Sequence, residues 1–275
     1  MLTLLPTNQI EHIHALLEGL SIHLVSRSIL AGSTPAQVYV DDPQQPSMAL
    51  VKAGHRILLC GSPSASPALT ADLKSCFESE IYPEFVANHV EGFGVYYAPT
   101  AWADLLAQIF TDRQTYHTRR EYYAGLPESG SWRASLPEGF SLRPVDAALL
   151  ADPQISGLDD LREEMCSERP SVPDFLARSF GLAAIYDNRL AGWCLSEYNS
   201  ENECEIGIAS LPPYRQCGLA VSMTRAFAEM ALQRGIRRIG WHCWASNTPS
   251  GATARKAGLS KICDYQAYVV ILGSV

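Results

Sequence analysis

The sequence has no long apolar run, no cluster of basic residues and no leader-like start. No segment approaches the ~18 uninterrupted apolar residues that a membrane-spanning helix needs. The start, MLTLLPTNQIEHIH, has neither a basic region nor a small-residue cleavage site, so we expect a cytoplasmic protein without a membrane partner. The net charge of −8 and the lack of Lys/Arg-rich segments argue against nucleic-acid binding, which depends on clustered cations.

The eight cysteines lack the spacing of a metal or redox motif. They are spread along the chain, no pair has CxxC spacing, and most lie in apolar surroundings such as ILLC and AGWC. Reduced cysteines there behave as small hydrophobic residues, so we expect neither a disulfide framework nor a zinc site. Glu11 and His14 have the spacing of a di-iron helix, but a single copy is typical of a polar helix face, and no metal is expected.

What the chain does contain is helix and strand patterns in two stretches. With 47% hydrophobic residues it can bury a sizeable core. Residues 1–125 predict an N-terminal α/β domain, and 139–275 predict a second domain of α+β class. The Gly/Ser-rich segment 126–138 between them predicts a linker, with a mobile active-site loop as the alternative.

The periodicity of apolar residues predicts the elements of both domains. In the first domain we expect helices at 9–30, 68–85 and 101–110, and strands at 37–42, 47–54, 56–61 and 92–99. In the second we expect strands at 139–145, 181–188, 189–198, 203–210, 237–244 and 265–272, and helices at 158–166, 218–235 and 249–258. Asp187-Asn188 predicts a hairpin turn, and Gly235 predicts the C-terminal cap of a strongly amphipathic helix.

The segment EIGIASLPPYRQCGLA, residues 205–220, predicts an anion site. A strand ends at Ser210, two prolines turn the chain, and an R-x-x-G-x-A segment opens the next helix. Amide groups at a helix start and the positive end of its dipole favour an anion there. Gly218 lets the backbone approach the anion, and Arg215 adds a charge-assisted contact. The motifs of P-loop and dinucleotide-binding proteins are absent, and an ordinary strand-to-helix turn is the alternative.

The order of these motifs resembles the GNAT superfamily of N-acetyltransferases. The strand EIGIAS, the segment Y-R-x-x-G-L-A, the later N-x-x-S and the A-R-K-A-G-L that ends the next helix occur in the order of that superfamily over residues 139–272. More narrowly, they resemble the branch that includes zwittermicin A resistance-type acetyltransferases. The resemblance implies a GNAT fold, a mixed and mostly antiparallel sheet flanked by helices, behind an N-terminal α/β domain that is a degenerate half-copy in one interpretation.

The resemblance also implies the positions that hold acetyl-CoA. A splay between the strands 203–210 and 237–244 would admit the thioester arm. The backbone of the first strand would pair with the arm, the amides at the helix start would hold the diphosphate beside Arg215, and two further residues would lie near the arm. These implied positions are Ile208, Ala209 and Ser210 for pairing; Gln216, Cys217, Gly218, Leu219 and Ala220 for the diphosphate; and Asn247 and Ser250 near the arm.

Acetyl transfer to an amine needs a base, because an ammonium group has no lone pair. We expect Glu205 to be that base, since GNAT enzymes often place a carboxylate on this strand; a solvent-facing carboxylate is the alternative, and Glu203 and Glu197 are further candidates. GNAT enzymes commonly place a tyrosine acid seven residues after the asparagine, where this chain has Ala254. Ser250, Tyr265, Tyr268 or solvent could take its place, so the acid stays unassigned; of these, Ser250 is the one that we count among the predicted catalytic residues.

Other polar groups have simpler interpretations. Alternation along a strand would point His242 and Cys243 to opposite faces, which favours a structural role over a nucleophile. The acidic helix at 158–168 would border the acceptor cleft; a solvated face is favoured over attraction of a cationic substrate.

We therefore predict an N-acetyltransferase that moves an acetyl group from acetyl-CoA to a small-molecule amine by direct transfer. A non-catalytic CoA-binding protein of the same fold and a plain interaction module are the alternatives. The acceptor, the acyl chain length and the oligomeric state stay open, and a homo-oligomer is compatible with the sequence.

Overall fold

The computed structural model describes residues 1–63, 66–126 and 135–273, which form two compact units. Unit 1 comprises Met1–Arg119 and the chain from Tyr265 onward, and unit 2 comprises Arg120–Asp264. The division differs from the predicted boundaries, because it falls inside two strands and not at the segment 126–138. Residues 127–134 of that predicted linker lie outside the described residues.

Unit 1 contains a mixed sheet in the order β1-β2-β3-β4-β5-β12. Its neighbouring strands are antiparallel except for β4 and β5, which are parallel. The strands are β1 (Thr3–Leu4), β2 (Gln37–Val40), β3 (Met48–Ala53), β4 (Arg56–Gly61), β5 (Gly92–Ala98) and β12 (Ser260–Ile271), the last contributing its C-terminal part.

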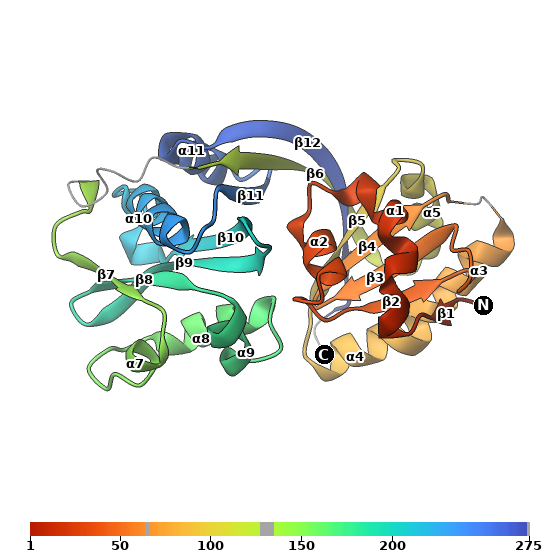
Figure 1. Ribbon diagram of the computed structural model, residues 1–275, viewed down its shortest axis with the longest axis horizontal. Coiled ribbons are helices and arrows are strands. Elements are labelled where there is room, and N and C mark those ends of the chain that lie inside the picture. Colours follow the sequence, from red (N-terminus) through yellow and green to blue (C-terminus); the bar gives the residue numbers. More distant parts are fainter. Residues whose placement is uncertain (64–65, 127–134, 274–275) are drawn as a thin grey trace. The chain divides into compact units, whose positions relative to one another are not determined.

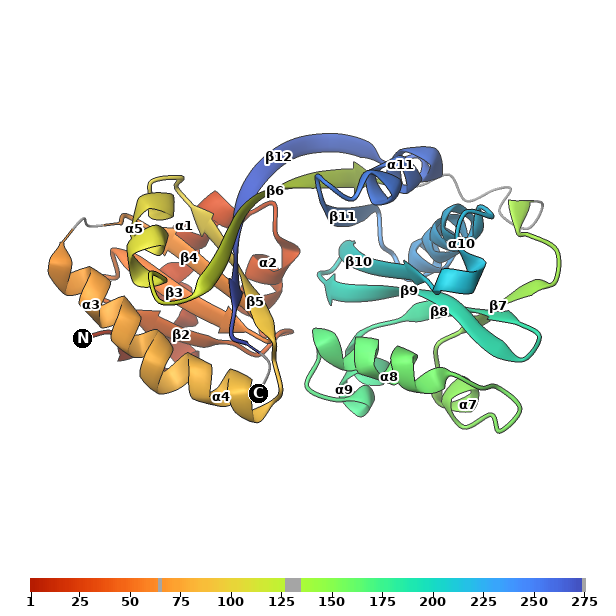
Figure 2. The same ribbon diagram turned by 180° about the vertical axis from the view of Figure 1, so that it is seen from behind.

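Helices cover both faces of this sheet (Figures 1 and 2). One face carries the short 3₁₀ and α segments η1 (Thr7–Ile13), α1 (His14–Leu17), η2 (Glu18–Leu20) and α2 (Leu24–Leu30), so the single helix expected over 9–30 is divided. The other face carries α3 (Pro67–Cys76), the π-helical segment η3 (Phe77–Ile81), α4 (Tyr82–Ala87) and α5 (Trp102–Ile109). Buried rings of Phe77, Phe93 and Phe110 pack between this second layer and the sheet.

Unit 2 contains a sheet in the order β6-β11-β10-β9-β8-β7, in which the parallel neighbours are β10 and β11. The other neighbours are antiparallel, which confirms the predicted α+β class with mixed, mostly antiparallel strands. The strands are β6 (Gln114–Gly125), β7 (Phe140–Pro144), β8 (Gly181–Tyr186), β9 (Arg189–Asn199), β10 (Glu203–Ser210) and β11 (Arg238–Trp244). The β8–β9 hairpin turns at Asp187 and Asn188, whose φ angles of 47° and 57° confirm the predicted turn.

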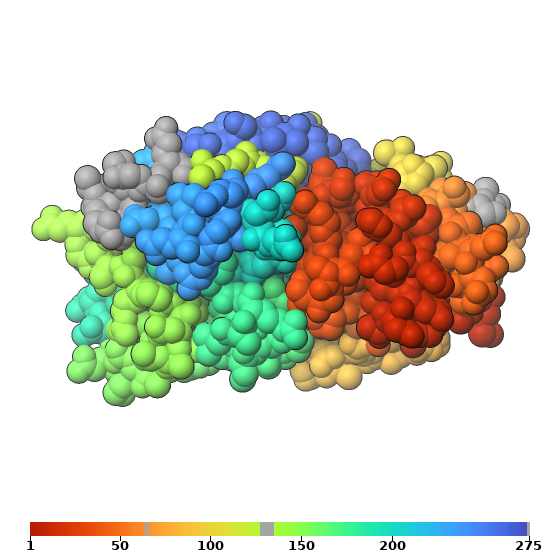
Figure 3. Space-filling model, in the orientation of Figure 1, coloured from red at the N-terminus to blue at the C-terminus, as the bar shows by residue number. Residues whose placement is uncertain are grey.

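Two helical layers enclose the unit 2 sheet (Figure 1). The helical segments are α7 (Ala147–Leu150), α8 (Leu158–Ser167), α9 (Val172–Arg178), η4 (Pro212–Tyr214), α10 (Leu219–Gln233) and α11 (Thr248–Ala257). One core lies between the sheet and α10, and another between the sheet and α8 with α9. The space-filling view shows α10 in blue and the α8–α9 region in green at the surface of this unit (Figure 3).

The amphipathic helix predicted over 218–235 is confirmed as α10. Met223 and Phe227 on its inner face are fully buried, and Phe227 stacks on Phe180 at 5.0 Å. The helix is followed by Gly235, whose φ of 85° is the left-handed conformation that closes many helices. The apolar face therefore fixes α10 on the sheet and fixes where its N-terminus lies.

Most of the cysteines are buried, as their apolar sequence surroundings predict. All eight are free, and Cys60, Cys76, Cys194, Cys204 and Cys243 are buried. Burial raises the pKa of Cys60 to about 12 and that of Cys76 to about 12 as well. These thiols are packing groups and not nucleophiles.

Candidate active site

The parallel strands β10 and β11 separate partway along their length. Their registered pairs run from Glu203↔Arg238 to Glu205↔Gly240, whereas β10 continues to Ser210 and β11 to Trp244. On its other side β10 stays paired with β9 as far as Ser210↔Gly192. The predicted splay is therefore confirmed, and the C-terminal half of β10 keeps β9 as its registered neighbour.

A β-bulge lies where the separation begins. Glu205 pairs with Tyr198 and the next residue, Ile206, pairs with Ser196, so Glu197 of β9 is the extra residue. A bulge bends its strand and redirects side chains, and such bulges are common beside active sites. The bulge thus accompanies the change in direction that takes β10 away from β11.

The start of α10 has the backbone conformation expected of an anion site. Gly218 lies in the left-handed region at φ 88°, Gln216 at φ 65°, and no side chain caps the helix. The Ser222 amide donates to the Gly218 carbonyl at 3.2 Å, so the three amides between them have no acceptor within the helix. A Cβ at Gly218 would have no heavy atom within 4 Å, so the space outside this helix end is open.

The remaining residues of the predicted cradle lie around this helix start. Arg215, Gln216 and Cys217 are exposed, and the Cys217 thiol donates to the Tyr214 carbonyl at 3.2 Å. Arg215 Nε donates to the carbonyl of Ser210 at 2.9 Å. The arginine therefore links the end of β10 to the turn before α10.

Asn247 and Ser250 form the start of α11. Asn247 is the N-cap of this helix, and its Oδ1 accepts from the Ser250 amide at 3.2 Å. The Ser250 hydroxyl accepts from Trp241 Nε1 at 3.0 Å. Both predicted residues are thus held beside β11 by local hydrogen bonds.

Glu205 is buried on β10 and contacts a histidine. Only 2% of its surface is exposed, and its Oε1 lies 3.3 Å from His242 Nε2 of β11. The His242 ring stacks on Tyr122 of β6, with ring centroids 4.5 Å apart. The predicted base is therefore part of a carboxylate–imidazole–phenol arrangement. His242 belongs to this arrangement, although strand alternation in the sequence favoured a structural role for it.

The alternative acids lie in different places. Tyr265 and Tyr268 belong to unit 1, where Tyr265 contacts His23 at 4.9 Å and Tyr268 stacks on His117 at 4.8 Å. Ala254, at the usual tyrosine position, is fully buried on α11. Neither tyrosine is part of the unit that contains the cradle.

The hydroxyl of Tyr123 lies against α11, about one turn before Ala254. It donates to Glu121 Oε2 at 2.7 Å and accepts from Arg255 Nη1 at 2.6 Å. A Cβ at Gly251 would lie 2.8 Å from this hydroxyl, so glycine is needed there. Burial raises the pKa of Tyr123, and its ion-paired surroundings hold the hydroxyl in a structural network.

Two carboxylates lie over β10 just beyond the bulge. A Cβ at Gly207 would lie 2.4 Å from Glu197 Oε1 and 3.4 Å from Glu164 Oε1. Burial, followed by the charges of Glu168 and Glu163, raises the pKa of Glu164. The acidic helix therefore places one of its carboxylates beside the splay, whereas Asp159, Asp160 and Glu163 are exposed.

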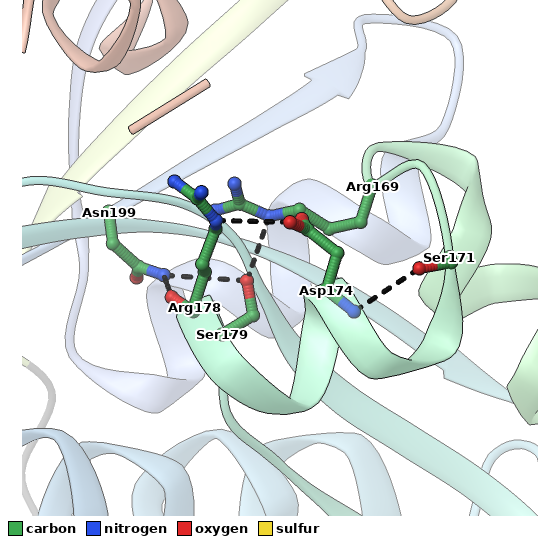
Figure 4. Close-up of polar contacts among 6 residues, drawn as sticks. All are labelled: Arg169, Ser171, Asp174, Arg178, Ser179 and Asn199. Carbon is green, nitrogen blue, oxygen red and sulfur yellow. Dashed lines mark hydrogen bonds and ion pairs between the residues drawn. The ribbon is translucent and has the colours of Figure 1, made fainter. Parts of the chain in front are cut away.

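A polar cluster fixes the segment after α8 to β9 (Figure 4). The buried Arg169 donates through Nε to Ser179 Oγ at 3.0 Å, and Asn199 Nδ2 donates to the Arg178 carbonyl at 2.8 Å. Arg178 pairs with Asp174 at 3.0 Å, and Ser171 caps α9 by accepting from the Asp174 amide. Burial lowers the pKa of Arg169. These contacts hold α9 and the segment that follows the Glu164 helix α8.

Within residues 1–63, 66–126 and 135–273, no group of three or more His, Cys, Asp or Glu side chains is placed to hold a metal ion. His12, the residue after Glu11, has its Nδ1 3.0 Å from the Pro43 carbonyl oxygen. In the same described residues, no helix combines the length and apolar character required to cross a bilayer.

Comparison with known proteins places the chain in a family. The GNAT acetyltransferase family model matches residues 14–268, so the chain belongs to the GNAT acetyltransferase family and has its fold. Members of this family are acyltransferases, and GNAT enzymes use acetyl-CoA. The family is the one that the motifs predicted, and the narrower zwittermicin A resistance branch stays a prediction.

Individual relatives extend over nearly the whole chain. The uncharacterized N-acetyltransferase YdfB of Bacillus subtilis (strain 168) is 24% identical over 241 residues, 88% of this chain and 88% of that protein. A GCN5-related N-acetyltransferase-like protein from Streptococcus suis superposes with a TM-score of 0.72 at 20% identity, covering 96% of this chain and 98% of the other. A tandem GNAT protein from the clavulanic acid biosynthesis pathway superposes with a TM-score of 0.58 at 11% identity, covering 100% and 99%.

Proposed function

We propose that this protein transfers an acetyl group from acetyl-CoA to the amine of a small molecule, by direct attack within a ternary complex. The observation that supports this most is the occurrence of two features within residues 205–218. The strand β10 separates from β11 beyond Glu205, and the helix that follows begins at Gly218 without a side-chain cap. The first feature suits an extended thioester arm, and the second suits a diphosphate.

In this proposal the backbone of Ile208, Ala209 and Ser210 pairs with the pantetheine arm. The amides of Gln216 to Ala220 bind the diphosphate, and Arg215 adds a positive charge beside it. Asn247 and Ser250 approach the arm from the start of α11. An amide of β10 near Ile208 stabilises the negative charge that develops on the thioester oxygen.

Glu205 acts as the base. Its carboxylate takes a proton from the ammonium form of the acceptor, and the amine nitrogen attacks the thioester carbonyl. The C–S bond breaks as the amide forms, and the leaving thiolate takes up one proton. The overall reaction converts an ammonium ion and acetyl-CoA into an amide, free CoA thiol and one released proton. Ser250 is the hydroxyl we propose to assist the leaving thiolate.

A positively charged amine suits the acceptor side. The chain carries a net charge of −8, and Glu164 and Glu197 lie over Gly207 beside the splay. Carboxylates there would attract an ammonium group as it approaches Glu205. Unit 1 is, in this proposal, a GNAT-like half-copy without a cofactor site of its own.

The test is acetyl-CoA turnover with a panel of small amines, followed by release of free CoA thiol. Glu205→Gln should lower kcat by about 10²- to 10⁴-fold, the range for loss of a general base. Glu203→Gln is the matched control, because Glu203 lies two residues earlier on the same strand and face. A larger loss in Glu203→Gln than in Glu205→Gln would move the base to Glu203.

The second candidate is a non-catalytic CoA-binding protein. Ala254, buried where many GNAT enzymes have a tyrosine hydroxyl, favours it. Binding of acetyl-CoA with no thiol release for any amine would select this candidate. Absence of acetyl-CoA binding would reject both and leave an interaction module.

A further inference from the structure

His242 is placed to control the orientation of the Glu205 carboxylate. The two side chains lie on parallel neighbours, β11 and β10, where the strands begin to separate. His242 Nε2 lies 3.3 Å from Glu205 Oε1, and the two side chains are only 6% and 3% exposed. Water therefore has little access to this contact, so the protein and not solvent determines its geometry.

The chemistry of the pair fixes which atom donates. An ionised carboxylate can only accept hydrogen bonds, whereas a neutral imidazole donates from one nitrogen and accepts at the other. The contact with ionised Glu205 therefore requires the proton on Nε2 of His242. The Nε2–H then holds Oε1 of Glu205.

The imidazole ring is itself held by β6. His242 and Tyr122 are direct partners in the β6–β11 register, and their rings stack at 4.5 Å with an interplanar angle of 14°. Arg238 Nη2 approaches the Tyr122 hydroxyl at 3.5 Å. A Cβ at Gly240 would lie 3.1 Å from Glu205 Cγ and 3.3 Å from the Tyr122 ring, so glycine at this position leaves room for the stack beside the carboxylate.

We propose that His242 is a positioning residue for Glu205. Its Nε2–H fixes Oε1, so that Oε2 is the oxygen that receives the proton of the acceptor amine, while the Tyr122 stack prevents the imidazole from rotating away. This inference rests on the proposed function, in which Glu205 is the base. His242 does not touch substrate in this arrangement.

His242 contacts the titratable side chains of Glu205 and Tyr122, and further charged residues lie on the same strands. Glu205 lies on β10, Tyr122 on β6, and Arg238 lies earlier on β11 itself, with Glu203 in register with Arg238. Burial raises the pKa of Tyr122. The positive charge of Arg238 lowers this pKa, and the negative charges of Glu205 and Glu203 raise it. Because His242 contacts Glu205 directly, a change at His242 should alter the pH dependence of turnover through its effect on Glu205.

Three variants test the proposal. His242→Phe keeps a ring for the Tyr122 stack and removes the donor. His242→Gln restores a side-chain N–H donor without the ring. Tyr122→Phe keeps the ring and removes the hydroxyl contact with Arg238. For each, we would measure kcat, KM for the amine, the acetyl-CoA Kd, the melting temperature and the pH profile of kcat.

We expect His242→Phe to lower kcat by up to about 100-fold, the loss that a misplaced catalytic group can cause. Its acetyl-CoA Kd should stay unchanged, and the limb of the pH profile that reports the base should move. His242→Gln should recover most of the lost kcat. Tyr122→Phe, which keeps the stacked ring, should lose less kcat than His242→Phe.

Three outcomes would overturn the inference alone. They are a wild-type kcat and pH profile in His242→Phe, a loss that His242→Gln does not reverse, and a loss of kcat that only follows a lowered melting temperature. The proposed function fails separately, if the wild-type chain releases no thiol or if Glu205→Gln is as active as the wild type.

Discussion

Each unit contains three neighbouring strands with the same pairing directions, but the extent of the parallel pairing differs between the units. In unit 1, β3 and β4 are antiparallel and β4 and β5 are parallel; in unit 2, β9 and β10 are antiparallel and β10 and β11 are parallel. The β4–β5 pairing continues from Arg56↔Gly94 to Cys60↔Ala98, whereas the β10–β11 pairing ends at Glu205↔Gly240. The same arrangement is therefore closed in unit 1 and open in unit 2.

The helix that follows the first strand of the parallel pair, α3 in unit 1 and α10 in unit 2, also begins differently in the two units. In unit 1, Ser66 caps α3 by accepting from the Leu69 amide at 3.1 Å, and Pro67 removes a further donor from the helix start. In unit 2, α10 begins at Gly218 without a side-chain cap. Unit 1 thus has a side-chain acceptor at its helix start, whereas the start of α10 has no side-chain cap that would compete with the proposed diphosphate.

The two units also differ in the neighbours of their less exposed charged side chains. In unit 1, the buried Lys52 pairs with Glu84 at 2.6 Å. In unit 2, the carboxylates of Glu164 and Glu197 both lie near Gly207. Like charges brought together without full access to water cost stability, and proteins accept that cost mainly where function requires it. This difference supports the proposal that binding and catalysis belong to unit 2.

The largest effect should come from giving α10 the kind of cap that α3 has. In Gly218→Asp, a carboxylate at the N-cap would occupy the helix amides and repel the diphosphate; aspartate tolerates the left-handed conformation. We expect the acetyl-CoA Kd to rise about 100-fold, or about 2.8 kcal/mol, in calorimetric titration.

Gly218→Asn, of similar shape but without charge, should have a smaller effect on the acetyl-CoA Kd. Gly235→Asn is the matched control, since Gly235 has nearly the same φ and equally open surroundings at the other end of α10. An unchanged Kd in Gly218→Asp would break the comparison, because it would show that the diphosphate does not bind at this helix start.

Removing the cap of unit 1 should affect stability and not binding. Ser66→Ala should lower the free energy of unfolding by about 1 kcal/mol, since the Leu69 amide loses its acceptor. The acetyl-CoA Kd should be unchanged. Ser171→Ala, which removes the equivalent cap of α9 in unit 2, is the control for the size of the stability loss. Weaker acetyl-CoA binding in Ser66→Ala alone would assign part of the cofactor site to unit 1.

The smallest effect concerns the crowded carboxylate Glu164. Burial raises the pKa of Glu164, so the folded protein favours the protonated carboxyl more than the unfolded chain does. Its contribution to stability is therefore complete below the ordinary glutamate pKa of about 4.3 and is lost as pH rises through the raised value. Glu164→Gln should raise the free energy of unfolding at pH 7 by up to about 1 kcal/mol and leave it unchanged near pH 4.

Denaturant unfolding at the two pH values measures this difference. Glu163→Gln on the exposed side of α8 should change little, and Glu84→Gln in unit 1 should have the opposite sign, because it removes the partner of Lys52. Destabilisation in Glu164→Gln at pH 7 would mean that Glu164 is held by favourable contacts and not by crowding.

Local patterns in the sequence predicted much of unit 2 correctly. The amphipathic period of α10, its glycine end and the Asp-Asn turn depend on neighbouring residues, so they can be read directly. Strand β6 was not predicted, because QTYHTRREYYAG is polar and has no regular alternation. Likewise β12 begins at Ser260, before the predicted start at 265, in a charged segment.

The candidate site was predictable only in part. Glycine, arginine and the turn before α10 form a local motif, and the cradle follows from it. The contact between Glu205 and His242 depends on pairing β10 with β11 across the intervening α10, which no local pattern encodes. Strand alternation correctly separated His242 from Cys243, whose thiol lies near Ser250, but it could not show that the histidine side chain reaches a carboxylate.

The two divided strands have a consequence for how the protein is made. The edge of β5 is completed by the pairs Ala267↔Tyr96 to Ile271↔Gly92, which join segments far apart in the chain. During synthesis, every residue of unit 2 leaves the ribosome before residues 267–271 do. Unit 2 can therefore complete its sheet first, and unit 1, although its synthesis begins earlier, must wait with an unpaired strand edge for its last partner.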